Sequence, residues 1–276
     1  MSNISFSNKW KAINKNFQNE DADEETLFVE KGKDPITQRQ LNLFYYFLFI
    51  KNIFSNIENV NDVLEIGCGR GTLSLYLATY LRLTTSLQDV SGDAIDIAKK
   101  DFDKYNHKAN FYIGDIINNT LPSDSYDAAV SIGLAEHFEL KDVESLFREQ
   151  HRLLRDGGVM ISLNIPRKFS VQFLNEIMRF VKKIFGQYKE DIKKDYFRNS
   201  LEPIEYKKIA EKVGFKNIEI TNVCPFPIYT PIKMTTDKKI TKFNKFILKV
   251  KSLFQKYPYK TNYIMSQAHF LVGYKK

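Results

Sequence analysis

A glycine-rich turn and an acidic residue downstream of it form a pattern that could bind a nucleoside. Within Val63–Leu73, an apolar strand runs into a turn that contains Gly67, Gly69 and Gly71 and then opens a helix. Glycine has no Cβ, so the backbone N–H groups of such a turn can approach a ligand closely. Asp89 ends the next apolar strand, about 20 residues further on, where a carboxylate can accept hydrogen bonds from a ribose diol.

The spacing of the glycines argues against a dinucleotide. A dinucleotide fingerprint has the form G-x-G-x-x-G. Here the third glycine comes one position early, at Gly71, and Thr72 stands where that fingerprint has glycine. Glu65 precedes Gly67 by two residues, and its charge would repel a pyrophosphate more than a sulfonium amino acid. A nicotinamide-dependent dehydrogenase is therefore disfavoured.

The pattern E-x-G-x-G-x-G resembles the class I S-adenosylmethionine-dependent methyltransferases, in particular their small-molecule branch (methyltransferase types 11 and 25). The resemblance implies S-adenosyl-L-methionine as cofactor, with Glu65 contacting its ammonium group through water and the glycines admitting its aminoacyl end. It also implies that Asp89 binds the ribose hydroxyls, that Asp115 accepts from the adenine amino group and that Ile116 packs on the ring. The cofactor-binding residues implied are Glu65, Gly67, Cys68, Gly69, Gly71, Asp89, Val90, Asp115, Ile116 and Ser131.

The segment Leu134–Phe138 resembles the "EHF" segment of the same branch and supplies two candidate catalytic residues. His137 is the first candidate base, because a histidine can take a proton near neutral pH. A histidine there could instead merely orient the loop. Glu136 is an alternative, as an orienting residue or a substrate contact.

Metal and thiol chemistry are not indicated. His107, His151 and His269 show no ligand spacing to one another, so no metal is expected. Cys68 and Cys224 are too few for a disulfide framework. Cys68 lies inside the glycine turn, where a small side chain is wanted, and a catalytic thiol there is disfavoured.

Alternating strands and helices must position these residues. They predict an α/β fold with a parallel sheet covered by helices on both faces. The resemblance specifies a Rossmann-like, seven-stranded, mostly parallel sheet whose last strand is antiparallel. Helices are expected over Asp93–Tyr105 and Asp142–Leu154, with another ending at Gly214. Strands are expected over Asn110–Ile116, Ser125–Gly133, Val159–Ile165, Lys216–Val223 and Tyr263–Tyr274.

The chain of 276 residues is expected to form one domain. It comprises an N-terminal helical cap (1–60), a cofactor-binding core (61–165) and two substrate-side insertions (166–202 and 224–262). The apolar run Leu41–Ile50 is too short to span a bilayer, which needs about 20 residues, and it is interpreted as a buried helix. Residues 1–15 lack the apolar core of a signal peptide, so a cytoplasmic protein is expected, with a membrane-peripheral one as the alternative.

Both insertions have the pattern of amphipathic helices. One apolar stripe runs from Phe169 to Ile184. The other contains Ile240, Phe243, Ile247, Val250 and Phe254, opposite Lys245, Lys249 and Lys256. The favoured interpretation is that both stripes pack onto the core as a lid. The alternative is a basic amphipathic surface that touches anionic membrane or a lipid-linked substrate.

The resulting functional hypothesis is methyl transfer from S-adenosylmethionine to a small-molecule, sugar or lipid-type acceptor, on oxygen. Alternatives are a catalytically silent cofactor-binding subunit and a methyltransferase acting on nucleic acid or protein. Nucleic acid is the least favoured partner: the net charge of +8 fits it, but no RNA-binding module is visible. The amino methylases of nucleic acids also carry an Asn/Asp-Pro-Pro-aromatic signature after the fourth strand, and Ser131–Leu134 does not match it.

Overall fold

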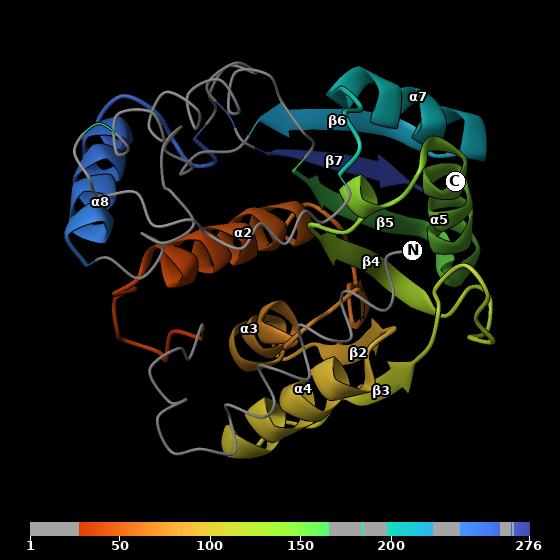
Figure 1. The fold of residues 1–276 in the computed structure, drawn as a ribbon, viewed down its shortest axis with the longest axis horizontal. Helices are drawn as coiled ribbons and strands as arrows, with labels where there is room; N and C mark the ends of the chain where they lie inside the picture. The colour runs from red at the N-terminus through yellow and green to blue at the C-terminus, as the bar shows by residue number, and fades with distance from the viewer. Residues whose placement is uncertain (1–27, 166–183, 185–197, 223–237, 260–265, 267) are drawn as a thin grey trace.

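A seven-stranded sheet forms the centre of the computed structural model (Figure 1), which describes residues 28–165, 184, 198–222, 238–259, 266 and 268–276. The strand order is β3-β2-β1-β4-β5-β7-β6, and β7 is antiparallel to both of its neighbours. The mostly parallel sheet with one antiparallel late strand confirms the predicted fold class. The strands are β1 (Asp62–Ile66), β2 (Thr84–Asp89), β3 (Asn110–Ile113), β4 (Tyr126–Ile132), β5 (Leu154–Asn164), β6 (Lys216–Asn222) and β7 (His269–Tyr274).

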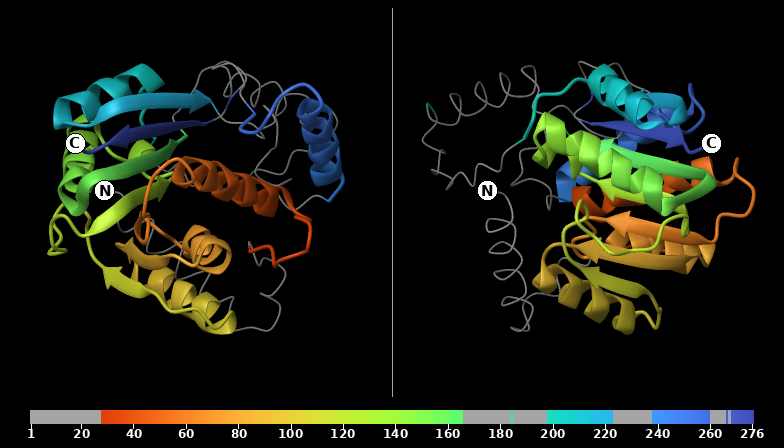
Figure 2. Two further views of the ribbon diagram at one scale, coloured as in Figure 1. Left: turned by 180° about the vertical axis from the view of Figure 1, so that it is seen from behind. Right: turned by 90° about the vertical axis from the view of Figure 1, so that its right-hand side faces the viewer.

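Helices cover both faces of this sheet (Figures 1 and 2). On one face, residues of α2, α3 and α4 pack against the inner strands, including the fully buried Ile50, Tyr76 and Phe102. On the other face, α5 and α7 contribute Phe147 and Tyr206. The helices are α2 (Gln38–Phe54), α3 (Thr72–Leu81), α4 (Gly92–Lys104), α5 (Leu140–Leu153), α7 (Pro203–Val213) and α8 (Lys238–Ser252), with a short 3-10 helix, η2 (Ala135–His137).

Burial on both faces explains why the central strands are almost continuously apolar. Strands β1, β4 and β5 end at the same edge of the sheet, because they are parallel. The loops that follow those carboxyl ends carry the residues predicted to bind ligand, as expected for an open α/β sheet.

Helix α2 fulfils the expectation of a buried helix ahead of the first strand. It begins with a capping box between Thr37 and Gln40, in which each side chain accepts a backbone N–H of the other residue. Further along it, the Phe49 ring stacks on Phe270 of β7 with centroids 4.1 Å apart. This stacking ties the N-terminal helix to the far half of the sheet. None of the described helices is long and apolar enough to cross a bilayer.

Some sequence expectations need correction. The late strand expected from Tyr263 begins at His269, and β5 begins at Leu154 rather than Val159, directly after α5. Helix α8 forms within the second insertion, but its predicted apolar stripe does not pack on the core. Phe243, Ile247, Val250 and Phe254 are exposed. The side chain of Ile240 and, except for the exposed Ile184, the first insertion's stripe lie outside the described residues.

Candidate functional site

The glycine turn after β1 has a backbone that favours glycine. Gly67, Gly69 and Gly71 have φ values of 66°, 53° and 66°, in the left-handed region. The N–H groups of Gly67 and Cys68 both donate to the Gln88 carbonyl of β2, at 2.8 and 3.0 Å. A Cβ on Gly71 would overlap a methyl group of Leu87. Glycine therefore allows both the left-handed backbone of this turn and its close packing against Leu87.

Asp89 is fixed against this turn by main-chain donors. The Gly69 N–H donates to its Oδ2 and the Ser91 N–H to its Oδ1, each at 2.9 Å. The Ser91 side chain also accepts from the Ala94 N–H and caps α4, as the sequence predicted. Val90 is exposed beside the buried Asp89. The arrangement holds an acceptor carboxylate at the end of β2, next to the glycine turn.

Glu65 lies beneath the first turn of α3. Its Oε2 accepts from both the backbone N–H and the hydroxyl of Ser74, so it caps a helix whose own N-cap, Gly71, has no side chain. Burial raises the pKa of Glu65 to about 7; the Ser74 hydrogen bonds oppose this rise, and the charge of Asp89 adds to it. The sequence did not reveal this capping role.

Cys68 is buried, and the charges of both Glu65 and Asp89 act on its thiol. Burial is the first cause of its pKa lying well above the ordinary value, and the charges of Glu65 and Asp89 raise it further. The thiol therefore stays protonated near neutral pH.

Arg70, which lies in the glycine turn, forms an ion pair with a residue of α4. Arg70 donates through Nε and Nη2 to Oδ2 of Asp101, at 3.3 and 3.1 Å, and each of these side chains is only 10% exposed. This ion pair joins the turn to the helix that follows β2. The pair was not predicted, because the two residues are far apart in sequence and follow no common motif.

Asp115 and Ile116 follow β3 in a loop that is tied to β2. The Gly114 N–H donates to the Asp89 carbonyl at 3.0 Å, and the Gln88 side chain donates to the Gly114 carbonyl. The Asp115 carboxylate is exposed and accepts from the Ile117 N–H at 3.0 Å. Ile116 is buried in the core on the α5 side of the sheet. The structure thus brings Asp115 near Asp89.

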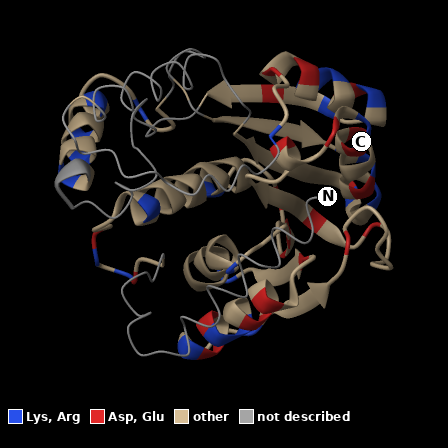
Figure 3. Ribbon diagram, in the orientation of Figure 1, with Lys and Arg blue, Asp and Glu red and all other residues tan. Residues whose placement is uncertain are grey.

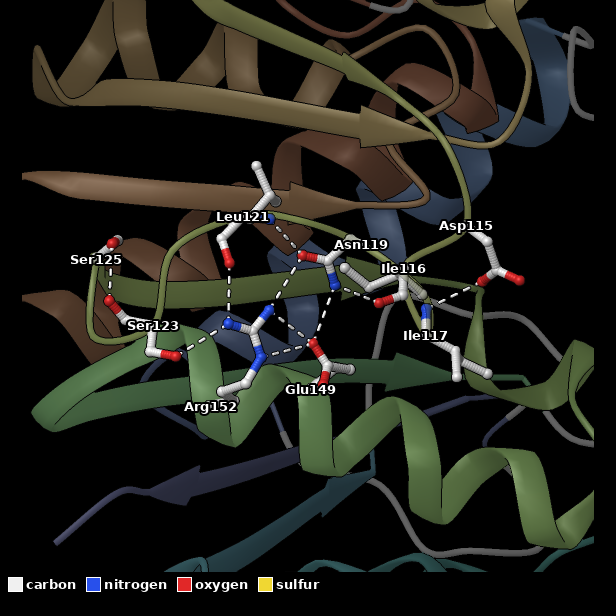
Figure 4. A network of polar contacts seen from close by, with 9 residues as sticks. All are labelled: Asp115, Ile116, Ile117, Asn119, Leu121, Ser123, Ser125, Glu149 and Arg152. Carbon is white, nitrogen blue, oxygen red and sulfur yellow. Dashed lines mark hydrogen bonds and ion pairs between the residues drawn. The ribbon is translucent and has the colours of Figure 1, made fainter.

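Arg152 of α5 fastens the rest of this loop (Figure 4). It donates to the Leu121 carbonyl at 2.9 Å and to the Asn119 side chain at 3.1 Å, and it pairs with Glu149 at 2.8 Å. Asn119 in turn donates to Glu149 at 3.0 Å and to the Ile116 carbonyl. The loop that carries Asp115 is therefore held by one cation and its partners.

Buried polar side chains cross the carboxyl end of the sheet. Ser131 of β4, in register with Ile66 of β1, donates to Ser162 of β5 at 3.2 Å. Ser162 donates to Asn164 at 2.9 Å, and the Asn164 amide lies 3.4 Å from His269 Nε2 of β7. Only Ser131 was singled out from the sequence. Ser162, Asn164 and His269 could have been found as polar residues within otherwise apolar strands.

Glu136 lies in η2, just after β4, and is almost fully buried. Its Oε2 has no hydrogen-bond partner among the described residues. Burial raises its pKa to about 7; a hydrogen bond from its own backbone N–H, the charge of Arg198 and a hydrogen bond from the Ile165 backbone oppose this rise. The same carboxylate contributes to the raised pKa of Tyr46 on α2, after burial of the phenol itself. A buried acid that titrates near neutral pH is a candidate for proton transfer.

Asn199 holds the segment around Glu136 and was not predicted. Its backbone N–H donates to the Glu136 carbonyl at 2.7 Å, and its side-chain amide donates to the carbonyls of Ala135 and Phe138, both at 3.0 Å. The Tyr206 hydroxyl donates to the Asn199 side-chain oxygen at 2.7 Å. His137, the other candidate, is half-buried in the same segment.

No group of three or more His, Cys, Asp or Glu side chains within the described ranges could hold a metal ion. An open depression of about 400 Å³ is lined by Thr84, His107 and Asn110 among others. It lies at the amino ends of β2 and β3, on the opposite edge of the sheet from the candidate site, so it is not part of that site.

The described site therefore contains three kinds of acceptor along one edge. The Asp89 carboxylate, held by backbone N–H groups, suits a diol, and the exposed Asp115 suits an amino group. The buried Glu65 suits a cation, because an adjacent cation favours its ionised form. These three acceptors fit the hydrogen-bond donors of an adenosine linked to an amino acid.

Residues 63–158 match the model of a protein family described as a methyltransferase domain. Among curated proteins, a ubiquinone biosynthesis O-methyltransferase of Coxiella burnetii is 24% identical over 179 residues, which are 64% of this chain and 73% of that protein. Methyltransferase GfsG of Streptomyces halstedii is 26% identical over 166 residues, 59% of this chain and 55% of that protein.

Solved structures share the fold. A phosphoethanolamine N-methyltransferase 2 of Haemonchus contortus in complex with S-adenosyl-L-methionine has a TM-score of 0.54 at 20% identity, covering 83% of this chain and 52% of that one. The PH0226 protein of Pyrococcus horikoshii has a TM-score of 0.53 at 17% identity, covering 86% of this chain and 92% of that one.

Proposed function

Because the chain belongs to the class I S-adenosylmethionine-dependent methyltransferases, with S-adenosylmethionine as its methyl donor, we propose that it methylates an oxygen atom of a small-molecule acceptor of sugar or lipid type. The observation that carries the choice of oxygen is the buried Glu136, with an unpartnered carboxylate oxygen and a pKa of about 7. The curated O-methyltransferase relative supports it.

The residues of the glycine turn hold and orient the cofactor in this proposal. Asp89 accepts from the ribose hydroxyls, with Val90 alongside, and Gly67, Cys68 and Gly69 leave room for the aminoacyl end. Glu65 faces the ammonium group. The other proposed cofactor contacts are Gly71, Asp115, Ile116 and Ser131, on the loops and strand ends described above.

The cofactor supplies an electrophilic methyl group on a sulfonium sulfur. Glu136 accepts the proton of the acceptor hydroxyl as the new C–O bond forms and the C–S bond breaks. A carboxylate with a pKa near 7 is suited to this step at neutral pH, because it is partly ionised and still basic enough to take the proton. His137 is the alternative base in the same segment.

The first experiment is calorimetric binding of S-adenosylhomocysteine, with NADH as the rival ligand and Asp89→Ala as the control variant. Micromolar binding that is lost in the variant supports the assigned site. Preference for NADH, or no binding of either ligand, would contradict it.

The second experiment measures methyl transfer to phenols, sugars and lipid headgroups, with RNA and protein as further acceptors. Glu136→Gln should lower kcat while binding of S-adenosylhomocysteine is unchanged, and His137→Gln should have a smaller effect. The reverse ranking would make His137 the base. Binding without turnover on any acceptor would favour the silent cofactor-binding subunit.

A further inference from the structure

Helix α8 carries most of its described apolar side chains on the face that is turned away from the protein. Six large apolar residues are between 37% and 82% exposed. Three residues of the helix, two of them polar, are buried. At about 100° per residue, these two sets occupy opposite sides of the helix. The exposed set is Phe243, Phe246, Ile247, Val250, Leu253 and Phe254, the last two just after the helix end; the buried set is Thr241, Asn244 and Leu248.

Contacts with α2 fix this orientation. The buried Asn244 amide donates to the side chain of the buried Gln38. Leu248 packs with Leu41 and Tyr259 in a small apolar cluster. Both contacts belong to the first turns of α2, and Figure 1 shows α8 beside them, beyond the carboxyl ends of β4 and β5. Rotating the apolar face inward would break this buried amide pair and leave its polar groups without partners.

Lysines border the exposed apolar face. Lys242 and Lys249 lie along one side of it and Lys251 along the other, as helical geometry places them. The sequence from 238 to 256 contains no Asp or Glu, and Figure 3 shows the helix without acidic residues. The face therefore combines large apolar groups with one sign of charge.

We propose that this face of α8 docks onto the surface of a bilayer that contains anionic phospholipid. A helix with an apolar face and flanking lysines binds in the plane of a membrane interface, where its apolar groups enter the acyl boundary and its lysines meet acidic headgroups. The negative surface potential of such a bilayer attracts lysines that lie near it. A second copy of the chain fits less well, because pairing two such faces would bring lysines together with no acid on either helix.

Vesicle flotation of the full chain tests the proposal. The protein should float with phosphatidylcholine vesicles that contain phosphatidylglycerol, and far less with phosphatidylcholine alone. Lys242→Gln/Lys249→Gln should lower the partition coefficient about tenfold or more, as should Leu253→Ser/Phe254→Ser. High salt should weaken binding of the wild-type chain.

Matched variants control for lost charge and lost apolar surface. Lys208→Gln/Lys216→Gln removes the same charge from exposed positions elsewhere. Leu140→Ser/Ile204→Ser removes two apolar side chains that are 59% and 48% exposed on other helices. Both control variants should float like the wild type, and all variants should keep the wild-type thermal midpoint and affinity for S-adenosylhomocysteine.

Three results would overturn the proposal: no flotation of the folded wild-type chain with anionic vesicles, equal flotation of the α8 variants, or equal loss in the control variants. A dimer in light scattering that dissociates in Leu253→Ser/Phe254→Ser, without any vesicle binding, would assign the face to a second copy. Retained binding of S-adenosylhomocysteine separates each of these outcomes from failure of the proposed function.

Discussion

Cofactor binding should release a proton from Glu65. Its carboxylate is buried and has a pKa of about 7 in the ligand-free protein, so it is about half protonated at neutral pH. An ammonium group placed beside it favours the ionised form and lowers that pKa. Binding at neutral pH should therefore expel about half a proton per ligand, with about 0.9 at one pH unit lower and about 0.1 at one pH unit higher.

The same linkage makes affinity depend on pH. Below its pKa Glu65 must lose its proton before it can pair with the ligand, so affinity weakens as the pH falls. From about pH 8 to about pH 6 the dissociation constant of S-adenosylhomocysteine should rise about tenfold. Calorimetry in two buffers that differ in ionisation enthalpy measures both the proton count and the affinity.

Glu65→Gln is the decisive variant, because the glutamine oxygen can still accept from Ser74 and cap α3. It should remove the proton release and flatten the pH dependence. Glu136→Gln is the matched control, since Glu136 is equally buried and also has a pKa of about 7. Proton release that persists in Glu65→Gln, or disappears in the control variant, would refute the assignment of Glu65 to the ammonium group.

Three further predictions concern the stability of the fold. Gly71→Ala should lower the free energy of unfolding by about 2 kcal/mol or more in urea denaturation, because the new methyl group overlaps Leu87 and the backbone is strained. Gly157→Ala should lower it by about 1 kcal/mol, because its φ of 80° is strained but the space around it is open. Arg70→Met should lower the free energy of unfolding by about 3 kcal/mol, because it removes the guanidinium that is ion-paired with the buried Asp101 carboxylate. Arg70→Met/Asp101→Leu should recover most of that, and purely additive losses would contradict this account. The raised pKa of Glu136 stabilises the fold below the ordinary carboxyl pKa, and this stabilisation is lost as the pH rises through about 7. The free energy of unfolding should thus fall by up to about 3 kcal/mol between about pH 5 and about pH 8, and less in Glu136→Gln.

The features that sequence predicted are those set by local backbone chemistry. The glycine turn and the Ser91 cap depend on residues within a few positions of one another, and the alternation of strands and helices follows from hydrophobic periodicity. The seven-stranded sheet with an antiparallel last strand was implied by the family resemblance. Asn199 and the Arg70–Asp101 pair depend on segments that meet only in the folded chain, so no sequence spacing marks them.

The apolar stripe of α8 shows where periodicity misleads. A helical period identifies an apolar face but does not say what covers it. Here the buried amide of Asn244 and its partner Gln38 decide the orientation, and neither residue was singled out from the sequence.

The Asp89 clamp has a consequence for engineering this chain. Gly69 and Ser91 donate to Asp89 through their peptide N–H groups, which no substitution other than proline can delete. The segment around Glu136, in contrast, is held by the side chains of Asn199 and Tyr206, which single codon changes can replace. Mutational libraries aimed at a new acceptor can therefore change the contacts that position Glu136, whereas the peptide donors to the proposed ribose-binding carboxylate of Asp89 stay in place.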